Sequence, residues 1–144
     1  MQAALAAARQ AAGRGEVPVG AVITGPDGAL LAVAGNETEA RQDSTAHAEM
    51  LVIAAAQARM GSKYLAKCDL WVTLEPCAMC AGAIALARIR RLYYGASDPK
   101  GGAVEHGPRL FSQPTIHHRP DIYGGLSEAE ASHLLQDFFA ARRG

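Results

Sequence analysis

Two cysteines at the start of an Ala-rich segment are the residues best suited to chemistry. Cys77 directly follows Pro76, and two residues separate it from Cys80. Proline is common in the first turn of a helix, so a helix is predicted from Pro76 to about Arg88, with both thiols on one face of its first turn. Free N–H groups and the positive end of the helix dipole favour thiolates there. C-x2-C is a common half-site for zinc, although a pair of small buried residues has the same pattern.

A histidine and a glutamate in "TAHAEM" complete a possible catalytic group. His47 precedes another predicted helix, and Glu49 follows two residues later. One His and two Cys supply three protein ligands, which leaves the fourth position of a tetrahedral Zn²⁺ open, as in catalytic rather than structural zinc sites. Glu49 would then move protons to and from a zinc-activated water. A lone His or Glu indicates little, and the hypothesis depends on the combination.

Helices and strands alternate along the chain, and the whole of residues 1–144 is predicted to be a single domain. Strands joined through helices are expected to pair in parallel, and the first hairpin adds an antiparallel pair. The predicted fold class is α/β, a three-layer α/β/α sandwich with a mixed sheet of about five strands. The final helix opens with a possible capping box, Ser127 with Glu130. The predicted elements are helix 3–13, strand 17–24, turn 25–28, strand 29–35, loop 36–45, helix 46–60, strand 69–74, helix 76–88, strand 91–96, a mostly loop segment 97–125 with a short strand or turn, and helix 127–143.

Composition and charge narrow the possible partners. No run of 18 apolar residues is present and the N-terminal segment lacks the pattern of a signal peptide, so we expect a cytoplasmic protein with no membrane association. Three cysteines without an export signal make a disulfide framework improbable. The net charge is zero, but residues 88–119 carry six basic and two acidic side chains. Such a segment can contact phosphates, or it can be an ordinary solvated face.

The combination H-x-E followed by P-C-x-x-C is typical of zinc-dependent nucleobase deaminases. The sequence resembles the bacterial tRNA-specific adenosine deaminases (TadA), of the cytidine/deoxycytidylate deaminase-like superfamily, over essentially its whole length. The motifs that carry the resemblance are "EVPVGAV" (residues 16–22), "TAHAEM" (45–50), "VTLEPCAMCAGAI" (72–84), "RRLYYGASDPKGGA" (90–103) and "DFFAARR" (137–143), together with Asn36. The segment 104–125 differs from well-known members, which leaves its contacts with RNA open.

The resemblance implies a function and a set of site residues. Members hydrolyse adenosine to inosine at the wobble position of tRNA, bind the anticodon loop and form homodimers whose RNA site draws on both subunits. It implies one Zn²⁺ per subunit held by His47, Cys77 and Cys80, with Glu49 as the proton shuttle. The implied substrate contacts are Asn36 to the base, the Ala48 backbone, Val19 and Leu74 as walls of the base pocket, Asp98 near the RNA backbone, and Phe138 and Phe139 at the pocket mouth.

Two other functions fit the same residues. A deaminase of free guanine, free cytosine or a nucleoside would use the same zinc and glutamate but would not need the basic segment 88–119. A non-catalytic RNA-binding subunit with a structural zinc would not need Glu49. Phe138 and Phe139 are neighbours on a predicted helix, so at most one of them should face the core.

Overall fold

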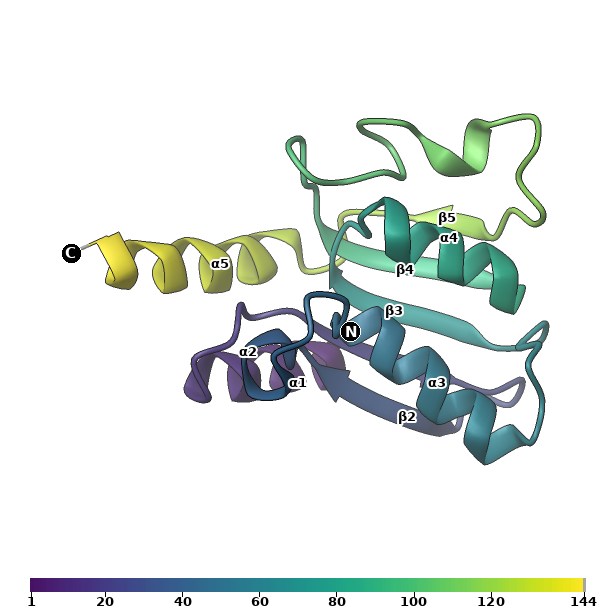
Figure 1. The fold of residues 1–144 in the computed structure, drawn as a ribbon, viewed down its shortest axis with the longest axis horizontal. Helices are drawn as coiled ribbons and strands as arrows, with labels where there is room; N and C mark the ends of the chain where they lie inside the picture. The colour runs from purple at the N-terminus through teal and green to yellow at the C-terminus, as the bar shows by residue number, and fades with distance from the viewer. Residues whose placement is uncertain (144) are drawn as a thin grey trace.

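A five-stranded mixed sheet organises the fold. The computed structural model describes residues 1–143 (Figure 1). The strands are β1 (Gly20–Thr24), β2 (Leu30–Gly35), β3 (Asp69–Leu74), β4 (Arg91–Ala96) and β5 (Asp121–Tyr123). Their order across the sheet is β2-β1-β3-β4-β5. β1 is antiparallel to β2 and β3, whereas β3, β4 and β5 are parallel to one another.

Helices cover both faces of the sheet. They are α1 (Gln2–Gly13), α2 (Thr38–Arg41), α3 (Ala48–Met60), α4 (Ala78–Ala87) and α5 (Glu128–Arg143), with a 3-10 turn at Leu110–Ser112. Figure 1 shows α3 and α4 side by side on one face, and α1 and α5 pack on the other. The α1 backbone lies so close to β1 that a Cβ on Gly20 would stand 2.0 Å from the Ala4 carbonyl oxygen. The three-layer α/β/α prediction is confirmed.

Alternation along the strands builds the core and sets the position of the site. In β3, Leu70 and Val72 are fully buried beneath α3 and α4. Trp71 points to the opposite face, where its ring stacks on Tyr93 with 3.8 Å between the centroids. Each of α3 and α4 runs back along the parallel strands, so the first turns of both helices lie at the end of the sheet where β3 and β4 finish. Side chains at those first turns can therefore converge.

Most predicted elements form, and two strands have the predicted bounds. β3 and β4 occupy residues 69–74 and 91–96 as expected, and the segment 97–125 contains only the 3-10 turn and the short β5. The first strand begins at Gly20 rather than at residue 17, since Pro18 has no N–H to donate and Val19 is joined to the chain after β2 by one backbone bond, from the Asn36 N–H to its carbonyl. Helix α4 begins at Ala78, and Cys77 is its N-cap, so the prediction that places Pro76 in the first turn is wrong by two residues.

Two local predictions are wrong because distant residues decide the structure. The predicted loop 36–45 contains the short helix α2. The capping box does not form, because Ser127 has φ +52°, in the left-handed region rather than the extended region of an N-cap. Glu130 instead forms an ion pair with Arg9 of α1.

No helix within residues 1–143 combines the length and the apolar character that crossing a membrane requires.

Candidate active site

Three possible metal ligands converge where α3 and α4 begin. His47 is the N-cap of α3, Cys77 is the N-cap of α4, and Cys80 lies in the first turn of α4. The His47 Nδ1 atom lies 3.7 Å from Cys77 Sγ and 3.6 Å from Cys80 Sγ. A tetrahedral zinc ion with sulfur at about 2.3 Å and nitrogen at about 2.0–2.1 Å separates such atoms by about 3.6 Å. The donor set therefore fits one zinc ion without rearrangement.

The two helix starts also supply a favourable field for anionic ligands. Each first turn presents to the site N–H groups that have no partner within the helix, together with the positive end of its dipole. The hydrogen bond with the Cys80 thiol, the contacts with N–H groups of α4 and the charge on His47 lower the pKa of Cys77 from 9.0 to about 5, against the opposing effect of burial. The same thiol contact, together with burial, raises the pKa of Cys80. Because zinc binds thiolates, binding of the metal would release the protons that the two thiols carry.

Glu49 lies in the first turn of α3, beside the three ligands. Its side chain is buried, with 4% of the residue exposed. Burial raises the pKa of this carboxyl from 4.5 to about 7, and the Cys77 thiolate acts in the same direction. The group stands next to the ligands without belonging to the converging set, which consists of His47, Cys77 and Cys80. A carboxyl in this position can hold or release a proton close to the metal.

A cavity of about 290 Å³ opens onto these residues. Val19 and Leu74 form part of its apolar wall, and Asn36 provides an amide. Asn36 is held on both sides, because its Oδ1 accepts the Ala48 N–H at 2.9 Å and its Nδ2 donates to the Val17 carbonyl at 3.2 Å. One amide hydrogen and one lone pair of this side chain remain for a ligand. The cavity is lined by Val17, Val19, Asn36, Thr38, His47, Glu49, Leu74, Glu75, Cys77, Asp98 and Gly101.

Comparison with known proteins agrees with this geometry. The model of the MafB19-like deaminase family matches residues 1–143. A tRNA-specific adenosine deaminase of Agrobacterium fabrum is 57% identical over 143 residues, which cover 99% of this chain and 93% of that protein. The chain belongs to the tRNA-specific adenosine deaminase family. Another member, from Rickettsia bellii, is 44% identical over 96% of this chain and 97% of its own length.

A solved structure of the same family has the same fold. It comes from a study of A-to-I editing by tRNA:A34 deaminases at the wobble position of transfer RNA. It superposes with a TM-score of 0.91 at 58% identity and covers 94% of this chain and 97% of that chain. The predicted cytidine deaminase-like architecture is thus confirmed, and the protein is a hydrolase of the deaminase class.

One buried carboxylate of this deaminase was not predicted from the sequence. Glu75, in "LEPC", is 2% exposed and binds the loop that borders the cavity. Its Oε1 accepts the Asp98 N–H at 2.9 Å, and its Oε2 accepts the N–H groups of Val104, Glu105 and His106 at 3.0–3.2 Å. The only sequence signal was a charged residue between a buried strand and the cysteine helix.

The same loop requires a glycine beside that carboxylate. A Cβ on Gly102 would stand 2.5 Å from the Glu75 carboxyl carbon and 2.5 Å from the Asp98 carbonyl oxygen. Burial alone would raise the pKa of Glu75, but its hydrogen bonds from Asp98, His106, Glu105 and Val104 outweigh burial and leave the pKa below 4.5. The carboxylate therefore stays ionised and keeps the loop against the cavity.

A second unpredicted carboxylate positions α2. Glu16 is 1% exposed, and its oxygens accept the N–H groups of Glu39 at 3.0 Å and Ala40 at 2.8 Å. These groups belong to the first turn of α2, which has no other partner for them within the helix. Glu16 therefore caps α2 from a distance and holds Thr38 at the cavity.

The remaining predicted contacts lie at different distances from the cavity. Asp98 lines it, while its carboxylate also accepts the N–H groups of Lys100 and Gly101. Ala48 is fully buried, and its N–H already binds Asn36. Phe138 and Phe139 do not line the cavity. Phe138 is 8% exposed and Phe139 is 44% exposed, which confirms that at most one of the pair faces the core.

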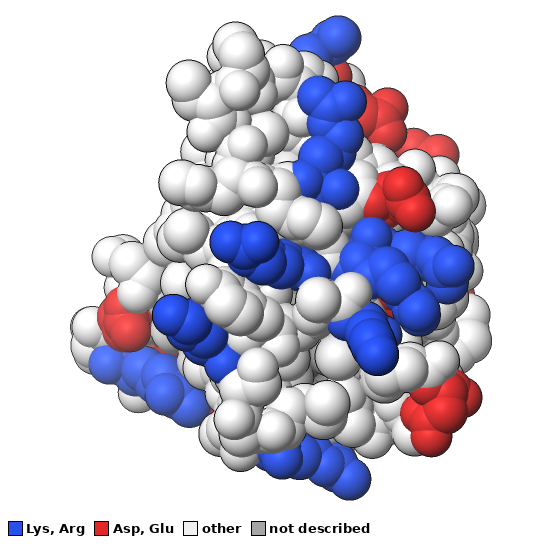
Figure 2. Space-filling model, turned by 90° about the vertical axis from the view of Figure 1, so that its right-hand side faces the viewer, with Lys and Arg blue, Asp and Glu red and all other residues white. Residues whose placement is uncertain are grey.

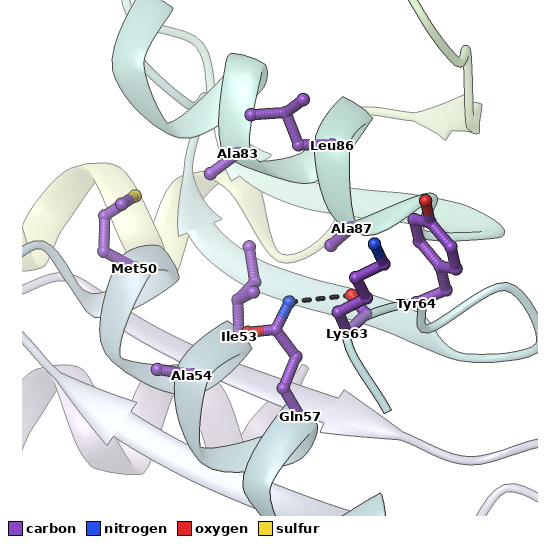
Figure 3. Close-up of a pocket in the computed structure, with 9 residues that line it drawn as sticks. All are labelled: Met50, Ile53, Ala54, Gln57, Lys63, Tyr64, Ala83, Leu86 and Ala87. Carbon is purple, nitrogen blue, oxygen red and sulfur yellow. Dashed lines mark hydrogen bonds between the residues drawn. The ribbon is translucent and has the colours of Figure 1, made fainter. Parts of the chain in front are cut away.

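A second depression lies on the outer side of the two helices. This α3–α4 hollow has a volume of about 450 Å³. Figure 3 shows Met50, Ile53 and Gln57 of α3 facing Ala83 and Leu86 of α4 across it. The other lining residues are Ala54, Lys63, Tyr64 and Ala87.

Proposed function

We propose that this protein hydrolyses adenosine to inosine at the wobble position of tRNA, with the anticodon loop presented to the cavity. The observation that carries the proposal is the cluster of His47, Cys77 and Cys80 beside the buried Glu49, in a cavity of about 290 Å³. That volume suits a single base taken out of its stack rather than a duplex, and a base in a single-stranded loop is the least costly to extract. Membership of the tRNA-specific adenosine deaminase family supports the same substrate.

The metal would be one zinc ion per subunit, held by His47 Nδ1 and the sulfur atoms of Cys77 and Cys80. When bound, zinc supplies a Lewis acid that lowers the pKa of a water molecule from about 15.7 to about 7. Three protein ligands leave one position of a tetrahedron for that water. The same donor atoms are soft or intermediate, which favours zinc over magnesium or calcium.

Glu49 would carry the protons of the reaction. Its carboxylate accepts one proton from the attacking water and delivers it to N1 of adenine, while the oxygen bonds to C6. The carboxyl then passes the second proton of the water to the exocyclic amine, which leaves as ammonia as the C6–N bond breaks. Adenosine and water are thereby converted to inosine and ammonia, and Glu49 returns to its starting state.

The other cavity residues would bind and orient the base. Asn36 has a free amide hydrogen and lone pair for the base edge, and its fixed orientation reduces the entropy lost on binding. Val19 and Leu74 would contact the faces of the ring, and the Ala48 backbone would support the zinc side of the pocket. Asp98 would lie near the RNA backbone.

Two further parts of the proposal concern the assembly. We propose a homodimer in the cytoplasm, where the tRNA substrate is found. Phe138 and Phe139 of α5 would reach substrate at the pocket mouth only if the bound RNA extends along α5, because neither ring lines the cavity.

The decisive experiment measures inosine in RNA. Zinc-loaded protein is incubated with a tRNA that has adenosine at the wobble position, with the matching anticodon stem–loop, and with free guanine, free cytosine and cytidine. We expect inosine in both RNAs, at a rate that follows the zinc content. Release of ammonia from a free base or nucleoside, with both RNAs unchanged, would assign the site to a small-molecule deaminase instead.

A further inference from the structure

The topology gathers cations at the end of the molecule opposite the cavity. The parallel strands β3, β4 and β5 begin at this end, and α3 and α4 finish there. Hydrogen bonds join these segments, from the Leu65 N–H to the Ala87 carbonyl and from the Arg90 N–H to the Cys68 carbonyl. Half of the 14 Lys and Arg side chains of the chain lie on or next to these element ends. We call this surface the basic end, and its cations are Arg59, Lys63, Lys67, Arg88, Arg90, Arg91 and Arg119.

Few acidic groups offset these cations. Figure 2 shows this end of the molecule, where blue side chains are spread over the face and red ones lie mainly at its right-hand margin. Asp69 is largely buried and is bonded to Arg90 at 2.9 Å, with Arg91 at 3.7 Å. Among residues 1–143, Asp27 and Asp121 are the other carboxylates at these element ends. The basic end therefore has a marked positive excess although the chain as a whole is neutral.

An exposed aromatic ring lies among the cations. Tyr64 is 43% exposed, with the Lys63 ammonium 5.0 Å and the Arg88 guanidinium 4.7 Å from the ring centroid. None of Lys63, Lys67 and Arg88 forms an ion pair with a carboxylate of the described residues. An aromatic ring flanked by free cations is a typical contact for nucleic acid, because it can stack on a base while the cations bind phosphates.

The segment that carries Lys63 and Tyr64 is fixed in place. Gln57 of α3 donates to the Lys63 carbonyl at 2.9 Å, a bond drawn in Figure 3, where the Lys63 and Tyr64 side chains lie beside the end of α4. Ser62 bonds the Tyr64 backbone through its hydroxyl. Little conformational entropy is therefore lost when this segment contacts a ligand.

Helix stability accounts for only part of this charge. A cation near a helix C-terminus stabilises the helix dipole, which gives Arg59 and Arg88 a structural reason for their positions. Lys67 and Arg119 precede strands, so the helix dipole does not explain them, although Arg119 also donates to the Phe111 carbonyl at 2.6 Å. Arg90 and Arg91 share one carboxylate, Asp69, so this group of three residues keeps a net charge of +1.

We propose that the basic end binds the phosphate backbone of the tRNA substrate outside the anticodon loop. This inference rests on the proposed function. β3 spans six residues, or about 20 Å, so the basic end is separated from the cavity by about that length. A loop whose base occupies the cavity cannot also reach this surface, whereas the larger body of a tRNA can. The basic end therefore adds affinity for full-length tRNA and none for an isolated anticodon stem–loop.

The test compares two RNAs on one variant. In the triple variant Lys63→Gln, Lys67→Gln and Arg88→Gln, we expect KM for full-length tRNA to rise about tenfold, with kcat unchanged. The slope of log affinity against log salt should fall by about 3, roughly one per lost phosphate contact. KM and kcat for the anticodon stem–loop should match those of the wild type.

A matched control keeps the charges. Lys63→Arg, Lys67→Arg and Arg88→Lys together should leave KM for full-length tRNA within about twofold of wild type, because phosphate neutralisation depends mainly on charge. Thermal unfolding of both triple variants checks that neither loses the fold.

An unchanged KM for full-length tRNA in the Gln variant would overturn the proposal, as would an equal loss on both RNAs. Loss of binding to anionic vesicles or to an acidic protein, with tRNA unaffected, would assign the surface to another partner and also overturn it. If the wild type deaminates neither RNA, the proposed function itself fails.

Discussion

Two depressions of the molecule lie beside α3 and α4, and the larger of these two has fewer chemical groups. The α3–α4 hollow has a volume of about 450 Å³, against about 290 Å³ for the candidate active-site cavity. Both lie against α3 and α4. The hollow touches the sides and later turns of the helices, where the backbone is fully hydrogen-bonded and the side chains are mainly apolar. The cavity touches the helix starts, where unpaired N–H groups, His47, Cys77 and Glu49 meet. The position of a depression relative to the helix ends, rather than its volume, thus decides which of the two collects groups that can do chemistry.

Loss of a metal ligand should give the largest effect. In Cys80→Ala, zinc content should fall far below one per subunit and inosine formation should fall to background, because two ligands rarely retain zinc. Metal analysis and turnover on the stem–loop are measured on one sample. Cys68→Ala is the matched control, since Cys68 is buried away from the site. It should lower the melting temperature but retain zinc and turnover, and loss of zinc in both variants would contradict the assignment.

Removal of the proton carrier, Glu49, should give the second largest loss of activity. Glu49→Gln keeps the shape of the side chain but cannot shuttle a proton, so kcat should fall roughly 10²–10⁴-fold with zinc and RNA affinity retained. Single-turnover kinetics on the stem–loop measure this. The neighbouring Met50 lines the hollow, and Met50→Leu should change kcat by less than about twofold. Full activity in Glu49→Gln would show that another group moves the protons.

Filling each depression tests the comparison directly. Val19→Phe adds bulk to the wall of the cavity and should lower kcat/KM by roughly 10–200-fold, the range that one misfit in an apolar pocket produces. Ala54→Leu adds bulk to the hollow and should leave kcat/KM for the stem–loop within about twofold. Equal losses in the two variants would mean that the hollow also takes part in the reaction.

The smallest effect on turnover is expected at Glu75, which acts through stability and pH. Because its folded-state pKa is below 4.5, the carboxylate stabilises the folded protein fully above that pH, and this contribution is lost as pH falls through the folded pKa. Glu75→Gln should lower the free energy of unfolding at neutral pH by about 1–3 kcal/mol. Urea unfolding from pH 7 to pH 3 should show the difference between variant and wild type shrink below about pH 4.5. If the difference in free energy of unfolding between variant and wild type stayed constant with pH, Glu75 would not be ionised in the folded protein as described.

Sequence reasoning works well where local pattern and chemistry coincide. β3 and β4 have their predicted bounds because apolar residues and flanking turns mark them locally. The group of His47, Cys77 and Cys80 was predictable because metal chemistry limits which residue types and spacings serve. Glu49 was singled out by the H-x-E spacing, and it is buried beside the ligands, while its role as proton carrier stays a prediction.

The failures concern bonds between distant residues. Glu16 creates α2 by capping it across more than 20 residues, and a propensity pattern in 36–45 contains no trace of that bond. Glu130 pairs with Arg9, 121 positions away, instead of completing a local capping box. Glu75 binds four backbone N–H groups, which every residue type except proline provides, and one side chain, His106, which lies 31 positions away, so no local pattern could identify its partners in the sequence.

The manner in which Glu75 holds its loop has a consequence for redesign. The carboxylate binds the main-chain N–H groups at positions 98, 104, 105 and 106 and the His106 ring, and it has no hydrogen bond with a side chain at positions 99–103. Pro99 and Lys100 are exposed within that span. The backbone of the loop therefore does not depend on the side chains at these two positions. A library randomised at positions 99 and 100 should change which nucleotides are preferred beside the target base, while the fold is retained.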